Sequence, residues 1–199
     1  MLEVTSAYST RATEYTEMIG TMDAVHHSDR HLVEAWAKSI NGAILDAGCG
    51  PGHWTNHLAG LGCTIRGVDL VPDFIQHARA TYPGVRFDQG SIESIEEPDD
   101  ELGGILSWFS TIHHDPSRIS APIAEFARAL RPGGTLLLGY FDSADTIEPF
   151  DHAVVQAYRW PAAALQTVLE AAGFVVVETH RRAERGRRPV GAIICELSG

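Results

Sequence analysis

The chain has 199 residues, enough for one domain with a substantial core, and 44% of them are hydrophobic and 21% charged. These proportions are typical of soluble globular proteins and exclude a disordered, collagen-like or coiled-coil chain. With 26 acidic against 15 basic residues, the net charge of −11 opposes broad binding to nucleic acids. We therefore expect no nucleic acid among its partners.

The cysteines and the N-terminal segment bear on the compartment. Cys49, Cys63 and Cys195 are odd in number and have no CxxC spacing, which predicts free thiols in a reducing compartment. The segment MLEVTSAYSTRATEYTEM lacks the basic and apolar stretches of a secretory signal, and no run of about eighteen apolar residues could span a membrane. We expect a cytoplasmic protein that does not bind membranes, and the sequence leaves its oligomeric state open.

Taken in chain order, apolar periodicity and turn residues predict helices and strands that alternate through most of the sequence. Helices are predicted over 6–19, 28–39, 53–61, 72–80, 117–130 and 161–172. Strands are predicted over 43–47, 64–70, 85–89, 105–109, 135–141, 174–180 and 190–197. The connecting stretch that runs to about residue 160 has no clear period and stays unassigned.

The alternation of strands and helices predicts a largely parallel sheet that is covered on both faces. The last two strands are joined directly by the Arg-rich segment 181–189, which is too short for a crossover and predicts an antiparallel hairpin. We therefore expect an α/β fold, a Rossmann-like three-layer sandwich with a seven-stranded, mostly parallel sheet and a final antiparallel hairpin. The domain would span 1–199, with a helical cover over 1–41 and the core over 42–199.

The strongest motif is ILDAGCGPGHWT at 44–55, where a predicted strand runs into Gly48, Gly50 and Gly52 before a helix. Glycines allow a tight turn and let a ligand approach the backbone, and the following helix offers unpaired N–H groups. Asp69 ends the second predicted strand about 20 residues further on, where an acid can accept both ribose hydroxyls. The two signals together predict a nucleoside-containing ligand.

The residues around the glycines distinguish between nucleosides. In the G-x-G-x-x-G pattern of dinucleotide-binding proteins, the third glycine would fall at His53. Asp46, two residues before the first glycine, would repel a diphosphate and attract an ammonium group. These features favour a positively charged nucleoside over NAD(P).

In these motifs the sequence resembles the class I S-adenosylmethionine (SAM)-dependent methyltransferases, in particular those that act on small molecules. The similarity covers about 40–197 and is carried by LDAGCGPG at 45–52, GVDL at 67–70, RALRPGGTLLLG at 128–139 and LEAAGF at 169–174. The resemblance implies SAM as cofactor and S-adenosylhomocysteine (SAH) as product.

The resemblance also implies roles for individual residues. Those that would hold the methionyl end of SAM are Asp46, Gly48, Cys49 and Gly50. Those that would contact the ribose and adenine are Asp69, Leu70, Ser91 and Ile92, with Ser91 standing where relatives often carry an acid. Those that would lie near the methionyl group or fold over the pocket are Trp108, Ser110 and, from the N-terminal helix, Tyr15, whose ring could instead only pack that helix on the core.

The segment STIHHDP at 110–116 supplies two candidates for a general base, His113 first and His114 second, because histidine titrates near neutral pH. The alternative is a turn in which one histidine caps the next helix and the other faces water. His53 and His57 are four residues apart, but no third ligand accompanies them, so we expect a solvated helix face and no metal site.

Two later segments bear on the acceptor. The Arg-rich segment 181–189 would leave its strand on the ligand side of the sheet, so it could bind an anionic acceptor or form a solvated hairpin tip. The stretch 141–160 carries Phe141, His152, Tyr158 and Trp160, which suit a mostly apolar acceptor pocket or a helical cover without selectivity.

The sequence therefore predicts a methyltransferase that uses SAM, releases SAH and acts on a small-molecule acceptor, with the acceptor atom left open. Two alternatives stay open at this point. One is an NAD(P)-dependent oxidoreductase, against which Asp46 and the missing third glycine count. The other is a SAM-binding protein that catalyses no reaction.

Overall fold

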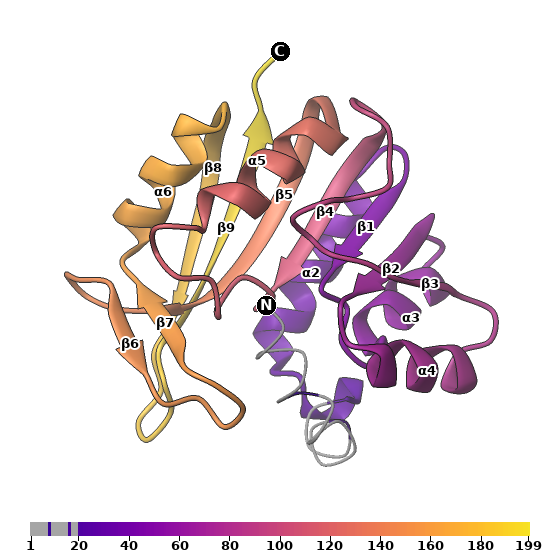
Figure 1. Cartoon of the computed structure of the whole chain (residues 1–199), viewed down its shortest axis with the longest axis horizontal. Coiled ribbons are helices and arrows are strands. Elements are labelled where there is room, and N and C mark those ends of the chain that lie inside the picture. The colour runs from indigo at the N-terminus through magenta and orange to yellow at the C-terminus, as the bar shows by residue number, and fades with distance from the viewer. Residues whose placement is uncertain (1–7, 9–15, 17–19) are drawn as a thin grey trace.

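The computed structural model describes Tyr8, Thr16 and residues 20–199. Its helices begin near the predicted residues and are separated by the strands of one sheet (Figure 1). The helices are η1 (Met22–Ala24), α2 (His27–Ser39), α3 (His53–Gly60), α4 (Pro72–Thr81), α5 (Ser120–Ala129) and α6 (Ala162–Ala171). Apart from Tyr8 and Thr16, the helix expected over 6–19 lies outside the described residues.

The strands of the described chain form one nine-stranded sheet. They are β1 (Ile44–Ala47), β2 (Ile65–Asp69), β3 (Arg86–Gln89), β4 (Leu102–Trp108), β5 (Leu130–Asp142), β6 (Glu148–Phe150), β7 (Ala157–Trp160), β8 (Phe174–Arg182) and β9 (Val190–Leu197). The order is β3-β2-β1-β4-β5-β7-β6, and β9 pairs antiparallel with both β5 and β8. Because two reversals separate β8 from β5, these two strands run in the same direction.

Alternating side chains along the strands divide the core into two layers. On one face Leu45 of β1 belongs to a core cluster with α5, which lies in front of β5 in Figure 1, and with α6, which lies in front of β8. On the other face Ile44 packs with α2 and α3. Trp36 of α2 reaches the sheet at Gly104, where a Cβ would lie 3.1 Å from the indole, and its Nε1 donates to Thr135 Oγ1 at 2.9 Å.

The predicted fold class is confirmed, including the antiparallel hairpin, and the sheet has two strands more than predicted. Both additional strands, β6 and β7, lie in the stretch before residue 160 that the sequence left unassigned. They are three and four residues long, too short to show an alternating pattern, and β6 contains Pro149, as edge strands tolerate. The segment RPGG at 131–134, expected to end a helix, belongs to β5.

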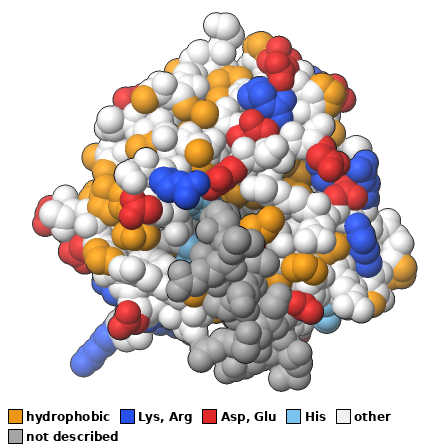
Figure 2. Space-filling view, in the orientation of Figure 1, with side chains coloured by type: hydrophobic (Ala, Val, Ile, Leu, Met, Phe, Trp, Pro, Cys, Tyr) orange, Lys and Arg blue, Asp and Glu red, His pale blue; other side chains and the backbone are white. Residues whose placement is uncertain are grey.

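The parallel strands β1, β2, β4, β5 and β8 end at the same edge of the sheet, and the loop joining β8 to β9 lies at that edge. Ligands of open α/β sheets bind at this edge. None of the helices in the described part of the chain combines the length and apolarity needed to cross a membrane. On the face seen in Figure 2, acidic and basic side chains are interspersed rather than gathered into one basic field.

Candidate functional site

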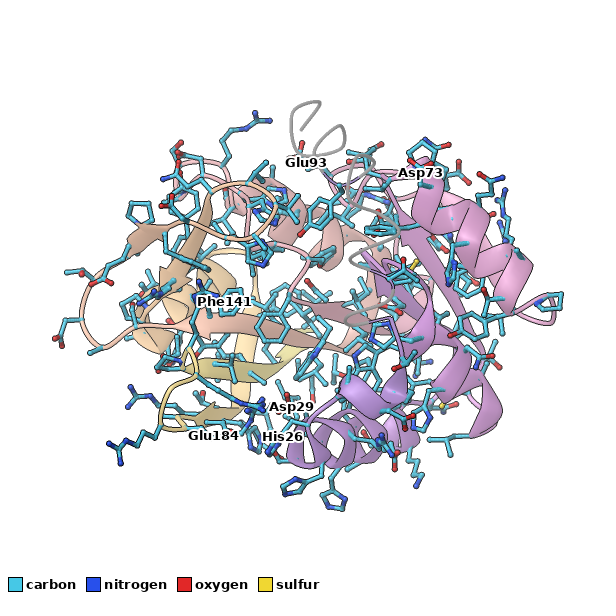
Figure 3. All side chains as sticks on the ribbon, turned by 90° about the horizontal axis from the view of Figure 1, so that it is seen from below. His26, Asp29, Asp73, Glu93, Phe141 and Glu184 are labelled. Atoms are coloured by element: carbon cyan, nitrogen blue, oxygen red, sulfur yellow. The ribbon has the colours of Figure 1, made fainter. Side chains whose placement is uncertain are left out.

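Two adjoining cavities open at the carboxyl edge of the sheet, which Figure 3 views from below. The wide cavity has a volume of about 420 Å³, and the narrow cavity one of about 120 Å³. They share four lining residues, Gly48, Gly50, Trp108 and Phe109. A single ligand could therefore extend from one cavity into the other along the glycine loop.

The glycine loop (48–52) is held against β2, because the N–H groups of Gly48 and Cys49 both donate to the Val68 carbonyl, at 2.8 and 2.9 Å. Gly48 has a φ of 81°, and a Cβ there would lie 2.3 Å from the Cβ of Ser110. Gly50 has a φ of 53°, and a Cβ there would meet no atom of the described residues within 4 Å. Gly48 is thus required by packing, whereas Gly50 leaves open space in front of the backbone.

Asp69 ends β2 and is 9% exposed at the wall of the narrow cavity. Its Oδ2 accepts from the Gly50 N–H and its Oδ1 from the Val71 N–H, both at 2.8 Å. Burial raises the pKa of Asp69, while these backbone donors lower it. Since each carboxylate oxygen has two lone pairs, Asp69 can hold its own loop and still accept from a ligand.

Asp46 lies in β1, 2% exposed, at the wall of the wide cavity. Thr55 of α3 donates its hydroxyl to Asp46 Oδ2 at 2.6 Å. Burial raises the pKa of Asp46 to about 7; the hydrogen bond from Thr55 opposes this rise, and the negative charge of Asp69 adds to it. No salt bridge to Asp46 occurs among the described residues.

Aromatic side chains at the end of β4 and directly after it line both cavities. Trp108 and Phe109 meet edge to face at 5.4 Å, and Phe109 also contacts Phe141 at 5.1 Å. Phe109 has a φ of 57°, and its N–H donates to the Gly139 carbonyl at 3.1 Å. A bulky residue with positive φ is strained, and such strain is concentrated at functional sites.

Both histidines predicted as bases line the narrow cavity, and both are bonded. His113 donates from Nδ1 to the Gln156 carbonyl at 2.9 Å, and its Nε2 accepts from the Tyr8 hydroxyl at 2.7 Å. His114 is 4% exposed, and its ring contacts the Thr111 carbonyl and the Glu93 carboxylate at 3.3 and 3.1 Å. Burial lowers the pKa of both imidazoles.

Three histidines among the described residues line the wide cavity, His26, His53 and His152, and sequence reasoning gave none of them a role in the reaction. His53 was expected on a solvated helix face, yet it is half-buried, and its Nδ1 has no partner among the described residues. By contrast, His57, one turn further along α3, is hydrogen-bonded to Glu34 of α2 at 2.7 Å. His152 accepts from the Val154 N–H through Nδ1 at 3.4 Å. Burial lowers the pKa of His53 and of His152 to about 4, so both are neutral at pH 7.

The outer wall of the wide cavity joins the β8–β9 hairpin to the start of α2. Arg182 donates to both carboxylate oxygens of Asp29, at 2.6 and 3.3 Å, and to Glu184 at 2.8 Å. His26 lies 3.2 Å from Glu184. In Figure 3, His26, Asp29 and Glu184 gather on one side of this edge, across from Glu93 and Asp73. Arg187 also reaches the cavity, with its side chain 68% exposed.

Comparison with known proteins identifies the family. A family model described as a methyltransferase domain matches residues 44–134. A protein of Mycolicibacterium smegmatis, named as a probable S-adenosylmethionine-dependent methyltransferase, is 30% identical over 145 residues, 68% of this chain and 53% of that protein. A malonyl-[acyl-carrier protein] O-methyltransferase of Yersinia pestis is 29% identical over 134 residues, 67% of this chain and 48% of that protein. The chain is thus similar to the SAM-dependent methyltransferases, consistent with class I.

A solved structure agrees in fold with this chain. It is the 1,6-didemethyltoxoflavin-N1-methyltransferase of Burkholderia thailandensis with bound 1,6-didemethyltoxoflavin and S-adenosylhomocysteine. The TM-score is 0.82 at 19% identity, over all of this chain and 88% of that one. The chain spans about half the length of the curated relatives named above.

The structure brings most residues of the predicted site together. Lining residues of the wide cavity include Asp46, Gly48, Cys49, Gly50 and Trp108. Lining residues of the narrow cavity include Asp69, Leu70, Ile92, Ser110, His113 and His114. Ser91 lines neither cavity, because its hydroxyl accepts from the Glu93 N–H at 3.1 Å and closes a turn. Tyr15 lies outside the described residues, whereas Tyr8 lines the narrow cavity.

Proposed function

We propose that this chain binds SAM across the two cavities and transfers its methyl group to a small-molecule acceptor in the wide cavity, releasing SAH. One observation carries the proposal. The glycine loop forms a wall common to both cavities, with the buried carboxyl group of Asp46 on the wide side and that of Asp69 on the narrow side. This arrangement suits a ligand with a hydroxyl-bearing end and a cationic end.

The narrow cavity fits the nucleoside end. Asp69 retains lone pairs for ribose hydroxyls after accepting from Gly50 and Val71. Leu70 and Ile92 line the same cavity and would pack against the adenine ring. The open space before Gly50 leaves room for the ligand to cross the loop. Since Ser91 lines neither cavity, its predicted bond to the adenine amino group depends on a rotation of its hydroxyl away from Glu93.

The wide cavity fits the methionyl end. Asp46 faces it without a salt-bridge partner among the described residues, so it would receive the ammonium group of the cofactor. A carboxylate in this position would repel a diphosphate, which argues against the NAD(P)-dependent alternative. The sulfonium supplies an already activated methyl group, so the protein chiefly needs to align the acceptor and exclude water. Trp108 and Phe109 line both cavities and would form the wall that aligns the acceptor with the methyl group.

A base is needed only for an acceptor that must lose a proton. His113 and His114 remain the predicted candidates, and each would have to exchange a hydrogen bond to serve. For His113 the bond to exchange is the one from the Tyr8 hydroxyl. His152 faces the wide cavity and keeps its Nδ1 as an acceptor, so its Nε2 carries a proton and would orient an acceptor oxygen.

The lining of the wide cavity limits the acceptor. Its inner part is aromatic and apolar, with Phe109, Ile112 and Phe141, and its outer part carries Arg182 and Arg187. We propose a small acceptor with an apolar body and an anionic group. The name of the Yersinia pestis relative gives a malonyl group on an acyl-carrier protein as the acceptor of that enzyme, which is consistent with an acidic acceptor.

Ligand-dependent unfolding tests the cofactor. We expect SAH to raise the melting temperature and NADH to leave it unchanged, because a ligand that binds only the folded state stabilises it by about 2.7 kcal/mol at a hundred times its Kd. Stabilisation by NADH alone would refute the proposal. Incubation with SAM and a library of metabolites then separates an enzyme, which releases SAH with one of them, from a protein that only binds SAM.

A further inference from the structure

An open groove outside the wide cavity is lined by four arginines. It has a volume of about 790 Å³, and its basic residues are Arg159, Arg182, Arg187 and Arg188. Among the described residues that line it, none is acidic. The groove shares Phe141, Arg182 and Arg187 with the wide cavity, so the two form one continuous surface. Such a cluster stands out in a chain of net charge −11.

The arginines differ in how their charge is neutralised. Arg182 is paired with Asp29 and Glu184, and Arg187 lies 3.6 Å from the same Glu184. By contrast, no salt bridge to Arg159 or Arg188 occurs among the described residues.

The contacts of these two arginines confirm that they lack acidic partners. Arg188 donates to the Asp151 backbone carbonyl at 3.4 Å, and the Nε of Arg159 is buried with no partner among the described residues. Glu148 stands opposite Arg159 in the β6–β7 pair, but its carboxylate accepts from Thr146.

Phe150 holds the two unpaired guanidinium groups in place. The Cζ atoms of Arg159 and Arg188 each lie 4.9 Å from the centroid of this ring, so they are no more than twice that distance apart. A ring face attracts a cation but leaves its N–H donors free for another ligand. Two like charges held this close repel each other, and an anion between them would remove that repulsion.

We propose that the acceptor has two parts, and that a dianionic group at its far end, a phosphate or a pair of carboxylates, is bound in this groove by Arg159, Arg187 and Arg188. Its reacting end would lie in the wide cavity, beyond Phe141. Guanidinium groups form paired hydrogen bonds with both kinds of anion. The inference rests on the proposed function for the position of the reacting end, whereas the binding of the anion can be measured without any methyl transfer.

Calorimetric titration with two probes, inorganic pyrophosphate and citrate, tests the groove with and without SAH. We expect at least one probe to bind, with at least about tenfold weaker binding in Arg159→Gln and in Arg188→Gln, since each removes charge-assisted hydrogen bonds. Binding of pyrophosphate alone assigns a phosphate, and binding of citrate alone assigns carboxylates. Arg185→Gln is the matched control, because Arg185 is exposed in the same loop and does not line the groove.

The outcome for the groove is separable from that for the cofactor site. All three variants should keep the melting temperature and the SAH affinity of the parent chain. If neither probe binds, or if Arg185→Gln weakens binding as much as the other two, the anion site is refuted. If SAH fails to bind the parent chain, the proposed function fails, and the titrations without SAH still decide the groove.

Discussion

Asp46 is a buried carboxyl group that has no salt-bridge partner among the described residues. Its pKa in the folded protein, about 7, lies above the ordinary value of 3.8, chiefly because of burial. A raised pKa means that the contribution of this group to stability is fully present below pH 3.8 and is lost as the pH rises through 7. The empty protein therefore becomes less stable with rising pH at this position.

Replacing Asp46 by Asn should reveal how much the buried negative charge destabilises the folded protein. Asp46→Asn keeps an oxygen for the Thr55 hydroxyl and removes the buried charge. We expect the free energy of unfolding without ligand to rise by roughly 2 kcal/mol at pH 8, with a clearly smaller gain at pH 6. Urea unfolding at both pH values measures the difference. A gain that is the same at both would show that ionisation is not its cause.

Cofactor binding should show the opposite pH dependence. A cation beside Asp46 favours the ionised carboxylate, so binding must first remove its proton when the pH is below 7. We expect SAH affinity to fall by up to about tenfold for each pH unit below 7, and to become weak and independent of pH in Asp46→Asn. Calorimetry between pH 6 and 8 checks this; equal SAH affinity in the variant would exclude the predicted contact.

The two glycines at the cavity wall should respond differently to a methyl group. Gly48→Ala forces a clash with Ser110 in a left-handed backbone, and we expect a loss of about 2–3 kcal/mol of stability. Gly50→Ala meets open space, so the loss should be about 1 kcal/mol, whereas SAH affinity should fall more than about tenfold. Thermal unfolding and calorimetry together separate these effects, and tight SAH binding by Gly50→Ala would place the ligand elsewhere.

At the scale of elements, the pair of Arg182 and Asp29 fixes the β8–β9 hairpin to α2. Both side chains are largely buried, and the guanidinium contacts both carboxylate oxygens. In a double-mutant cycle with Asp29→Asn and Arg182→Gln, we expect a coupling energy of about 1 kcal/mol in urea unfolding. Asp23→Asn in η1 serves as a control that should show no coupling. A coupling energy near zero would mean that the hairpin is held by other contacts.

The sequence predicted those helices and strands in which apolar residues recur at a regular spacing or form a run. Strands such as β1 and β9 are mostly apolar, and the glycine loop and Asp69 follow from their spacing. The short strands β6 and β7 could not be predicted, because three or four residues show no period. They are held by pairing with β5 and with each other, and such contacts depend on the folded chain.

The same limit applies to the candidate site. The residues predicted to bind the cofactor are local in sequence, and most of them line the two cavities. Phe109 gave no signal, because a positive φ is imposed on it by the surrounding structure. His53 was assigned to a solvated face, since no pattern along α3 shows that a cavity lies beside its first turn. The acceptor side combines η1, the 141–160 stretch and the hairpin, which meet only in the folded chain.

At the scale of the whole molecule, one half of the site lies within the residues that match the family model, and most of the other half lies outside them. The family model covers 44–134, which includes the glycine loop, Asp69 and the Trp108–Phe109 wall. Phe141, His152 and the arginines of the groove all lie after residue 134. The proposed cofactor half therefore lies within the matched methyltransferase domain, whereas the proposed acceptor half lies mostly outside it, in segments of the kind that commonly set specificity.

The wall shared by the two cavities has a consequence for kinetics. Trp108 and Phe109 bound both spaces, so the proposed cofactor, once seated, becomes part of the surface that the acceptor meets. An acceptor arriving first would find that surface incomplete. We expect a compulsory order of addition, with the nucleoside entering before the acceptor and leaving after the methylated product. Product-inhibition patterns would reveal a random order if this reasoning is wrong.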